Sequence, residues 1–257
     1  MTLNDIMLEC WAIARETGTN DTNRLWSSTE MKAYINRTYR HIARETRCIR
    51  DSETLSICRI DVAPPADYPT LQALALTDQY YAQDLIYYND PNSWLYNILV
   101  APYVFPLDPS ILDIDEVKWT SWPWRLMKVS VTKWQVNPLW EQVLSMPTEY
   151  ATDLSNNKLA INYRMSTPDT LRLIVKRLPL TDLVSLTDIP EIRQVYHDYF
   201  RYGVLEQMYS KQDSQTLDIP KALDFGTRYR DDIDHIKRQE RILDQRLKAN
   251  NSMDGFR

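Results

Sequence analysis

The sequence predicts an α+β protein in which helices from both ends of the chain form a base and a β-rich, sandwich-like unit is inserted between them. Three observations indicate this class: apolar residues recur at helical spacing near both termini, the apolar period changes near Asp51, and prolines punctuate the chain from Pro64 to Pro109. We therefore divide the chain into N-terminal helices (1–51), a β-rich domain (52–188), a C-terminal helical hairpin (189–249) and an extended tail (250–257).

Two helices are expected in the N-terminal part. Apolar residues recur at helical spacing from Leu3 onward, and this first helix is expected to end near Gly18. The second helix opens with a capping box, in which Ser27 is the N-cap and Glu30 follows three positions later. Its apolar stripe comprises Met31, Ile35, Thr38 and Ile42, and Tyr34 and Ala43 widen it.

Short segments that are rich in β-branched residues and bounded by turn residues predict about five to seven strands in the β-rich domain. The strands expected most clearly are 54–63, 112–119, 124–131, 158–164 and 170–178. A short helix at 137–144 is expected to interrupt them, and residues 76–100 fit a helix that runs into a strand.

Two further helices are expected in the C-terminal part. The first starts near Ile189–Pro190, because proline fits the first turn of a helix. Its broad apolar face comprises Ile192, Val195, Tyr196, Tyr199, Gly203 and Val204. The second runs from about Pro220 to Lys248 and carries a narrow apolar stripe, typical of a helix–helix seam, that only Glu240 interrupts.

Composition disfavours several classes of function. The chain has only 4 glycines, far apart, whereas phosphate-binding loops need clustered glycines so that backbone N–H groups can reach the phosphates. The net charge of −5 disfavours a surface that wraps nucleic acid or an anionic membrane, although it leaves room for a local basic patch. The three cysteines, Cys10, Cys48 and Cys58, fit buried thiols better than disulfides or a zinc site.

The candidate catalytic and metal-binding residues have simpler interpretations. His197 and Asp198 are neighbours whose side chains point about 100° apart on a helix, so they cannot act as a base and its orienting partner, and His197 is expected to be partly exposed. Asp231 and His235 share a helix face, but the arginines and lysines around them favour a solvated helix with internal ion pairs. The acids at 113–116 fit the solvent side of a strand. We expect no metal site and no cofactor.

Five of the eight tryptophans lie within residues 119–140. Such a cluster can stack sugars or unpaired bases. It more commonly fills a β core or a subunit interface, where large rigid rings dominate the energetics. The five are Trp119, Trp122, Trp124, Trp134 and Trp140.

The order of these signals resembles that of the head-to-tail adaptor (connector, or head-completion) proteins of tailed bacteriophages. Residues 26–46, WSSTEMKAYINRTYRHIARET, are similar to the early helix of that family, and residues 189–225 to its closing helical hairpin. Residues 103–119, YVFPLDPSILDIDEVKW, and 158–179 resemble its strands. Residues 64–102 are longer and richer in tyrosine than the family pattern.

The resemblance implies a structural virion protein of the phage neck, assembled in the host cytoplasm and without catalysis. It implies a homo-oligomeric ring, typically of twelve subunits, that binds the portal protein, receives tail, nozzle or fibre proteins, and continues the channel for double-stranded DNA. No membrane partner is implied. Residues expected to pack the helices or the ring are Tyr196, Tyr199, Gly203, Tyr229, Ile233 and Ile236; those expected to dock on the portal are Met253, Gly255, Phe256 and Arg257.

Two other hypotheses stay open at the level of the sequence. The alternative is a nucleic-acid- or carbohydrate-binding tail module that uses the tryptophans of 119–140. The third is a hydrolytic enzyme that uses Asp231, His235 or the carboxylates at 113–116.

Overall fold

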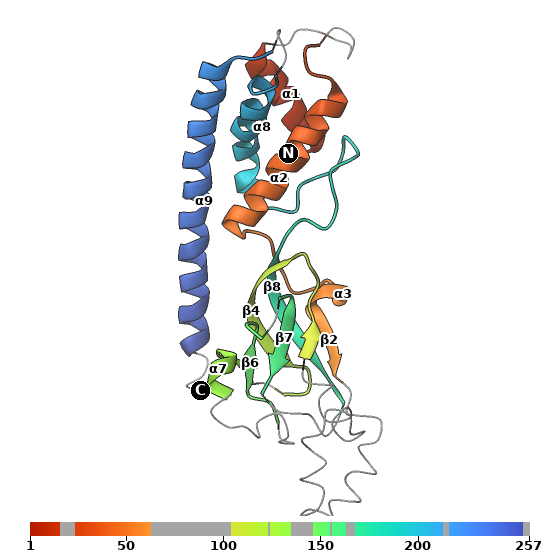
Figure 1. The fold of residues 1–257 in the computed structure, drawn as a ribbon, viewed down its shortest axis with the longest axis vertical. Helices are drawn as coiled ribbons and strands as arrows, with labels where there is room; N and C mark the ends of the chain where they lie inside the picture. Colours follow the sequence, from red (N-terminus) through yellow and green to blue (C-terminus); the bar gives the residue numbers. More distant parts are fainter. Residues whose placement is uncertain are drawn as a thin grey trace, which may run out of the picture. The chain divides into compact units, whose positions relative to one another are not determined.

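The computed structural model describes residues 1–15, 24–62, 104–122, 124–134, 146–154, 156–162, 168–212 and 216–253. It contains both helices and sheets, which confirms the α+β class (Figure 1). The chain divides into two compact units, a helical unit of Met1–Arg50 and Lys176–Arg257 and a β unit of Asp51–Val175. No helix among the described residues is long and apolar enough to cross a membrane.

The helical unit begins with α1 (Leu3–Ala14) and α2 (Ser28–Thr46). The predicted capping box of α2 is confirmed, since the Ser27 hydroxyl accepts from the Glu30 backbone N–H and the Glu30 carboxylate accepts from the Ser27 N–H at 3.0 Å. The end predicted for the first helix is wrong. Arg15 takes the left-handed conformation, with φ 57°, and its N–H bonds to the carbonyl of Ala12, so α1 stops at Ala14.

The predicted start of the C-terminal hairpin at Ile189–Pro190 is also wrong. Gln194–Tyr199 form a 3-10 helix, η4, and the α-helix α8 spans Phe200–Tyr209. Residues 183–188 are bound to α1 and α2 instead: the Leu3 N–H donates to the carbonyl of Asp188 at 2.8 Å, and the Asn36 side chain bonds to both backbone groups of Leu183. Residues 176–188 therefore belong to the helical unit and not to the β domain predicted for 52–188.

The last helix, α9 (Ile219–Met253), is 35 residues long. It continues beyond the predicted end at Lys248, so the tail predicted from residue 250 is helical as far as Met253. Gly255, Phe256 and Arg257 lie outside the described residues.

The core of the helical unit lies where these helices meet. Figure 1 shows α2, α8 and α9 side by side, and they share a continuous set of buried side chains. The Trp26 indole adds a buried hydrogen bond to the carbonyl of Met208 at 3.0 Å. Asp244 of α9 forms ion pairs with Arg50 and Lys176, the two residues at which the chain leaves this unit and returns to it.

The described part of the β unit contains two four-stranded sheets. In the first, β8 (Asp169–Arg177) pairs with β1 (Arg50–Asp51), β2 (Arg59–Val62) and β4 (Ile111–Trp119). The second has the order β3 (Val104–Pro106), β7 (Lys158–Ile161), β6 (Glu149–Ala151) and β5 (Met127–Lys128). In the first sheet Ile60 lies opposite Leu171.

Strands predicted at 112–119, 158–164 and 170–178 are confirmed, the second only as far as Ile161. The single strand predicted for 54–63 is wrong in its first half, where Leu55–Cys58 form a helical turn, α3. The Asp51 carboxylate accepts from the Thr54 N–H and hydroxyl and so starts this turn.

The strand predicted for 124–131 is reduced to β5, because the Asp153 carboxylate accepts the Val131 N–H at 3.0 Å and caps a second turn, α7 (Val131–Trp134). The segments 137–144 and 76–100, for which further elements were predicted, lie outside the described residues.

Candidate functional site

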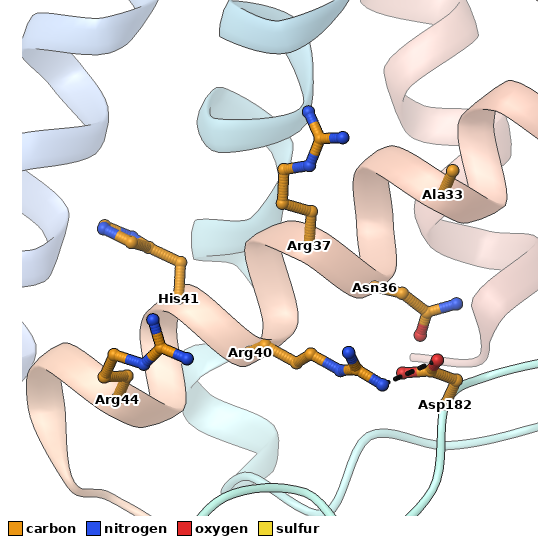
Figure 2. Close-up of a pocket in the computed structure, with 7 residues that line it drawn as sticks. All are labelled: Ala33, Asn36, Arg37, Arg40, His41, Arg44 and Asp182. Atoms are coloured by element: carbon orange, nitrogen blue, oxygen red, sulfur yellow. Dashed lines mark hydrogen bonds and ion pairs between the residues drawn. The ribbon is translucent and has the colours of Figure 1, made fainter.

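A basic groove runs along the outer face of α2. It has a volume of about 450 Å³ and is lined by Ala33, Asn36, Arg37, Arg40, His41, Arg44 and Asp182 (Figure 2). Positions 37, 40, 41 and 44 are spaced by three and four residues, which places them on one helix face. The spacing of these basic residues is visible in the sequence. Whether acidic side chains neutralise them is not, because acids distant in the sequence can approach them in the fold.

Most of the positive charge in the basic groove is not neutralised. Arg40 turns toward Asp182 and pairs with it at 2.8 Å (Figure 2). Arg37 and Arg44 are exposed and form no hydrogen bond or ion pair within the part of the chain that the structure describes. His41 bonds to the Tyr229 hydroxyl at 2.8 Å, which ties one side of the groove to α9. This surface can bind an anionic partner.

The residues predicted to pack the helices or the ring lie in the core of the helical unit. Gly203 is at the closest approach of three helices: a Cβ there would stand 2.7 Å from Thr38 Cγ2 on α2 and 2.8 Å from Tyr229 Cε2 on α9. Tyr199 is partly buried, and the other members are buried: Tyr196, Gly203, Tyr229, Ile233 and Ile236. These side chains are therefore used for helix packing within one chain, and ring contacts by them stay a prediction.

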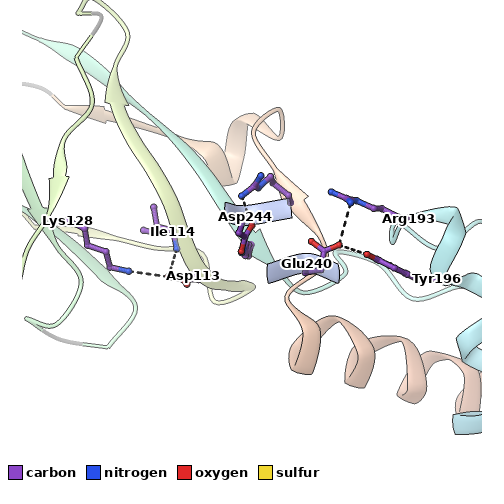
Figure 3. Close-up of polar contacts among 9 residues, drawn as sticks. Asp113, Ile114, Lys128, Arg193, Tyr196, Glu240 and Asp244 are labelled. Carbon is purple, nitrogen blue, oxygen red and sulfur yellow. Dashed lines mark hydrogen bonds and ion pairs between the residues drawn. The ribbon is translucent and has the colours of Figure 1, made fainter. Parts of the chain in front are cut away.

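Glu240, which interrupts the apolar stripe of α9, is buried and bound within the core. Its carboxylate accepts a hydrogen bond from the Tyr196 hydroxyl at 2.8 Å and pairs with Arg193 at 3.6 Å (Figure 3). Burial, and then the bond to Glu240, raise the pKa of the Tyr196 hydroxyl well above its usual range, so the tyrosine stays a donor. The polar residue thus locks the register of α9 against η4.

His197 and Asp198 do not form a catalytic pair. Contrary to the prediction of partial exposure, His197 is only 2% exposed, and its Nε2 lies 3.0 Å from the carbonyl of Ile192. Burial lowers the pKa of this imidazole. Asp198 is exposed.

The other titratable candidates are engaged in ordinary contacts. His235 of α9 lies 2.7 Å from Gln239 and contacts the Tyr199 ring. In the β unit, Asp113 pairs with Lys128 at 3.2 Å (Figure 3). Within the described ranges no three His, Cys, Asp or Glu side chains come together as a metal-binding group. The three cysteines are buried free thiols, as predicted.

The tryptophan cluster divides into core and surface residues. Trp119 and Trp134 are buried in the β unit, and the Trp134 indole donates to the Glu149 carboxylate at 2.9 Å. Trp122 and Trp124 are 45% and 69% exposed. Trp140 lies outside the described residues. The prediction that the tryptophans fill a β core is therefore confirmed for Trp119 and Trp134, whereas the rings of Trp122 and Trp124 are available to a partner.

Among the residues of α9 whose side chains are described, the last buried one is Glu240, and the helix continues beyond it. Ile242 is 49% exposed, and none of the side chains at 241–246 is buried. The helix continues to Met253, the first residue of the predicted docking segment. Comparison of the chain with protein-family models and with curated proteins finds no match.

Proposed function

We propose that the chain is a structural virion protein, a head-to-tail adaptor that forms a ring under the portal of a tailed phage. In this role it joins the portal to tail, nozzle or fibre proteins and continues the channel through which double-stranded DNA passes. It works by forming interfaces, without catalysis and without a cofactor. A ring of twelve copies in the neck of the particle is the arrangement that the sequence resemblance implies.

The observation that carries the proposal is that α9 is longer than the part of it that packs against the rest of the helical unit. Its 35 residues span about 52 Å at 1.5 Å per residue. Asp244 still pairs with Arg50 and Lys176, and the part of α9 after Asp244 accounts for about 14 Å. Most helical stability in proteins comes from tertiary packing, so a partner surface that covers this end would stabilise it. A helix end that projects from a packed unit is suited to docking on a partner as a helix in a groove.

The packing of the helical unit supports the same role. Close approach at Gly203 and the buried Tyr196–Glu240 bond hold α8, η4 and α9 in one arrangement. A ring needs subunits whose interfaces stay fixed relative to each other, and a packed helical unit supplies that rigidity.

The experiment is electron microscopy of the full chain with and without portal rings of the phage that encodes it. We expect the full chain to add a ring to one end of the portal. A variant that stops after Arg246 lacks Met253, Gly255, Phe256 and Arg257, and we expect it to leave the portal bare while its thermal unfolding stays unchanged. Failure of the full chain to decorate the portal would refute the proposal.

A second candidate function, a nucleic-acid- or carbohydrate-binding tail module, is favoured by the exposure of Trp122 and Trp124. Exposed aromatic rings stack on bases or sugars, and each stacked base contributes about 1–3 kcal/mol. Tryptophan fluorescence titrated with oligonucleotides and with glycans tests it, with the Trp122→Ala/Trp124→Ala variant as the control. Titrations that are flat for the full chain would eliminate this function.

A further inference from the structure

The basic groove of α2 has the features of a protein interface. Arg37 and Arg44 are exposed, and their guanidinium groups have no bonded partner among the described residues. Lys32 of the same helix donates to the carbonyl of Val184, which places that residue beside α2, and the Val184 side chain is 69% exposed. A large apolar side chain next to unpaired arginines is typical of the surfaces that proteins bury against one another, where arginine is enriched.

The same helical unit carries an acidic edge, formed by Asp198 of η4 and by Asp231 and Asp232 of α9. Tyr199, next to Asp198 in the chain, contacts the ring of His235, which lies one helical turn from Asp231. Burial, and then the charges of Asp232 and Asp198, raise the pKa of Tyr199. The Asp232 Oδ2 atom is buried and has no hydrogen-bond partner among the described residues. Burial raises the pKa of Asp232 to about 6; the charges of Arg201 and His235 oppose this rise, and Asp231 adds to it. A desolvated carboxylate of this kind is stabilised by a cation.

An exposed apolar residue accompanies the acidic edge as well. Val195 of η4 is 64% exposed. In a 3-10 helix residues three apart lie above one another, so Val195 and Asp198 share a face. Asp198 and Asp231 themselves form no hydrogen bond or ion pair within the described ranges.

The basic groove and the acidic edge lie on different sides of the unit. One edge of α9 is held against α2, where Lys237 pairs with Glu45 at 2.9 Å. The other edge is held against η4, where the His235 ring contacts Tyr199 at 6.0 Å between centroids. Two complementary surfaces that face different directions cannot satisfy each other within one copy. They can do so between successive copies, which is the head-to-tail geometry that generates rings.

We infer that the basic groove of one copy binds the acidic edge of the next copy. Arg37 and Arg44 then neutralise Asp198, Asp231 and Asp232, and Val184 and Val195 lose their exposure to water in the same contact. A nucleic acid would occupy only the basic groove and leave the acidic edge uncovered, so a second copy is the occupant that both surfaces favour. The inference rests on the proposed function, because it gives the interface by which the ring is built.

The experiment uses two full-length variants, Arg37→Glu/Arg44→Glu and Asp198→Lys/Asp231→Lys. The first keeps the acidic edge and the second keeps the basic groove. We expect the wild-type chain to self-associate in sedimentation velocity at low salt, and each variant alone to associate at least tenfold more weakly. A mixture of the two should recover association, because the intact acidic edge of the first variant meets the intact basic groove of the second, and the two reversed surfaces are complementary as well.

The matched control is Arg241→Glu/Arg246→Glu, which makes the same charge change at two exposed arginines of α9 that have no bonded partner among the described residues. It should associate as the wild type does. Circular dichroism verifies that all three variants fold.

The inference is overturned if the mixed variants stay monomeric, or if either variant alone associates as the wild type does. It is also overturned if Arg37→Glu/Arg44→Glu loses binding of a fluorescent DNA duplex and keeps its self-association. Decoration of portal rings is recorded separately with the wild-type chain, so a failed interface and a failed adaptor function give different results.

Discussion

Replacing Gly203 with alanine tests whether the three central helices are in contact as closely as the structure shows. The new Cβ would lie 2.7 Å from Thr38 Cγ2 and 2.8 Å from Tyr229 Cε2, distances that real Cβ atoms do not adopt. Overpacking a well-packed core costs about 1–3 kcal/mol. Alanine in a helix interior regains about 1 kcal/mol relative to glycine. We therefore expect Gly203→Ala to lower the free energy of unfolding by about 0–2 kcal/mol.

The assay is thermal unfolding followed by circular dichroism at a helix-sensitive wavelength. A loss of about 2 kcal/mol, the upper end of this range, lowers Tm by about 4–8 °C in a chain of this length. Thr38→Ser removes the methyl group that the new Cβ meets and keeps the hydroxyl, which accepts from Gln207 Nε2 at 2.8 Å. Gly203→Ala should therefore cost less in the Thr38→Ser background, and the double-mutant cycle measures that coupling.

Gly226→Ala is the matched control. A Cβ at Gly226 would meet the Glu206 carboxylate at 2.6 Å, but this is the far end of a flexible side chain that can move away. We expect Gly226→Ala to be neutral or slightly stabilising, because alanine favours the helix. A Gly203→Ala variant that unfolds at the same temperature as Gly226→Ala, or higher, would refute the packing described for α2, α8 and α9.

Glu240→Ala removes the acceptor of the Tyr196 hydroxyl and should cost about 1–3 kcal/mol in urea unfolding, whereas Glu240→Gln keeps an acceptor and should cost less; equal losses would contradict the hydrogen bond. The pKa of Asp232 is raised from 3.8 to about 6 in the folded chain, so the folded state holds this proton more tightly than the unfolded state does. The stability it contributes is full below about pH 4 and is lost as the pH rises through about 6. Asp232→Asn should flatten urea stability between these pH values and raise it at neutral pH, and an unchanged slope would sink the idea. Ser27→Ala should cost about 1 kcal/mol by breaking the cap of α2, and no change in Tm would contradict it.

The sequence predicted an element correctly where the contacts that determine it join residues close together in the sequence. The start of α2 was predicted because Ser27 and Glu30, the two halves of its cap, are three residues apart. Strands 112–119 and 170–178 were predicted because their apolar patterns and bounding turns are local.

The predictions failed where a distant contact decides. A helix was predicted to start just after Asp188, but backbone groups of this segment bond to α1, near the other end of the sequence. Glu240 was interpreted as an interruption of the apolar stripe of α9. Its role as a hydrogen-bond acceptor could not be predicted, because its partner Tyr196 is 44 positions away. The positive charges of the basic groove were visible in the sequence. Their pairing was not visible, since Asp182, the acid that pairs with Arg40, is 142 positions away.

The helical unit is built from two segments that the whole β unit separates along the chain, and this determines when it can fold. The hydrogen bond from the Trp26 indole to the carbonyl of Met208 can form only after a residue 182 positions later has been synthesised. Thr38 of α2 likewise cannot be buried until α8 and α9 have been synthesised. Contacts of such long range fold slowly, because the intervening chain must first be brought together. A nascent chain on the ribosome therefore lacks this unit until translation is nearly complete.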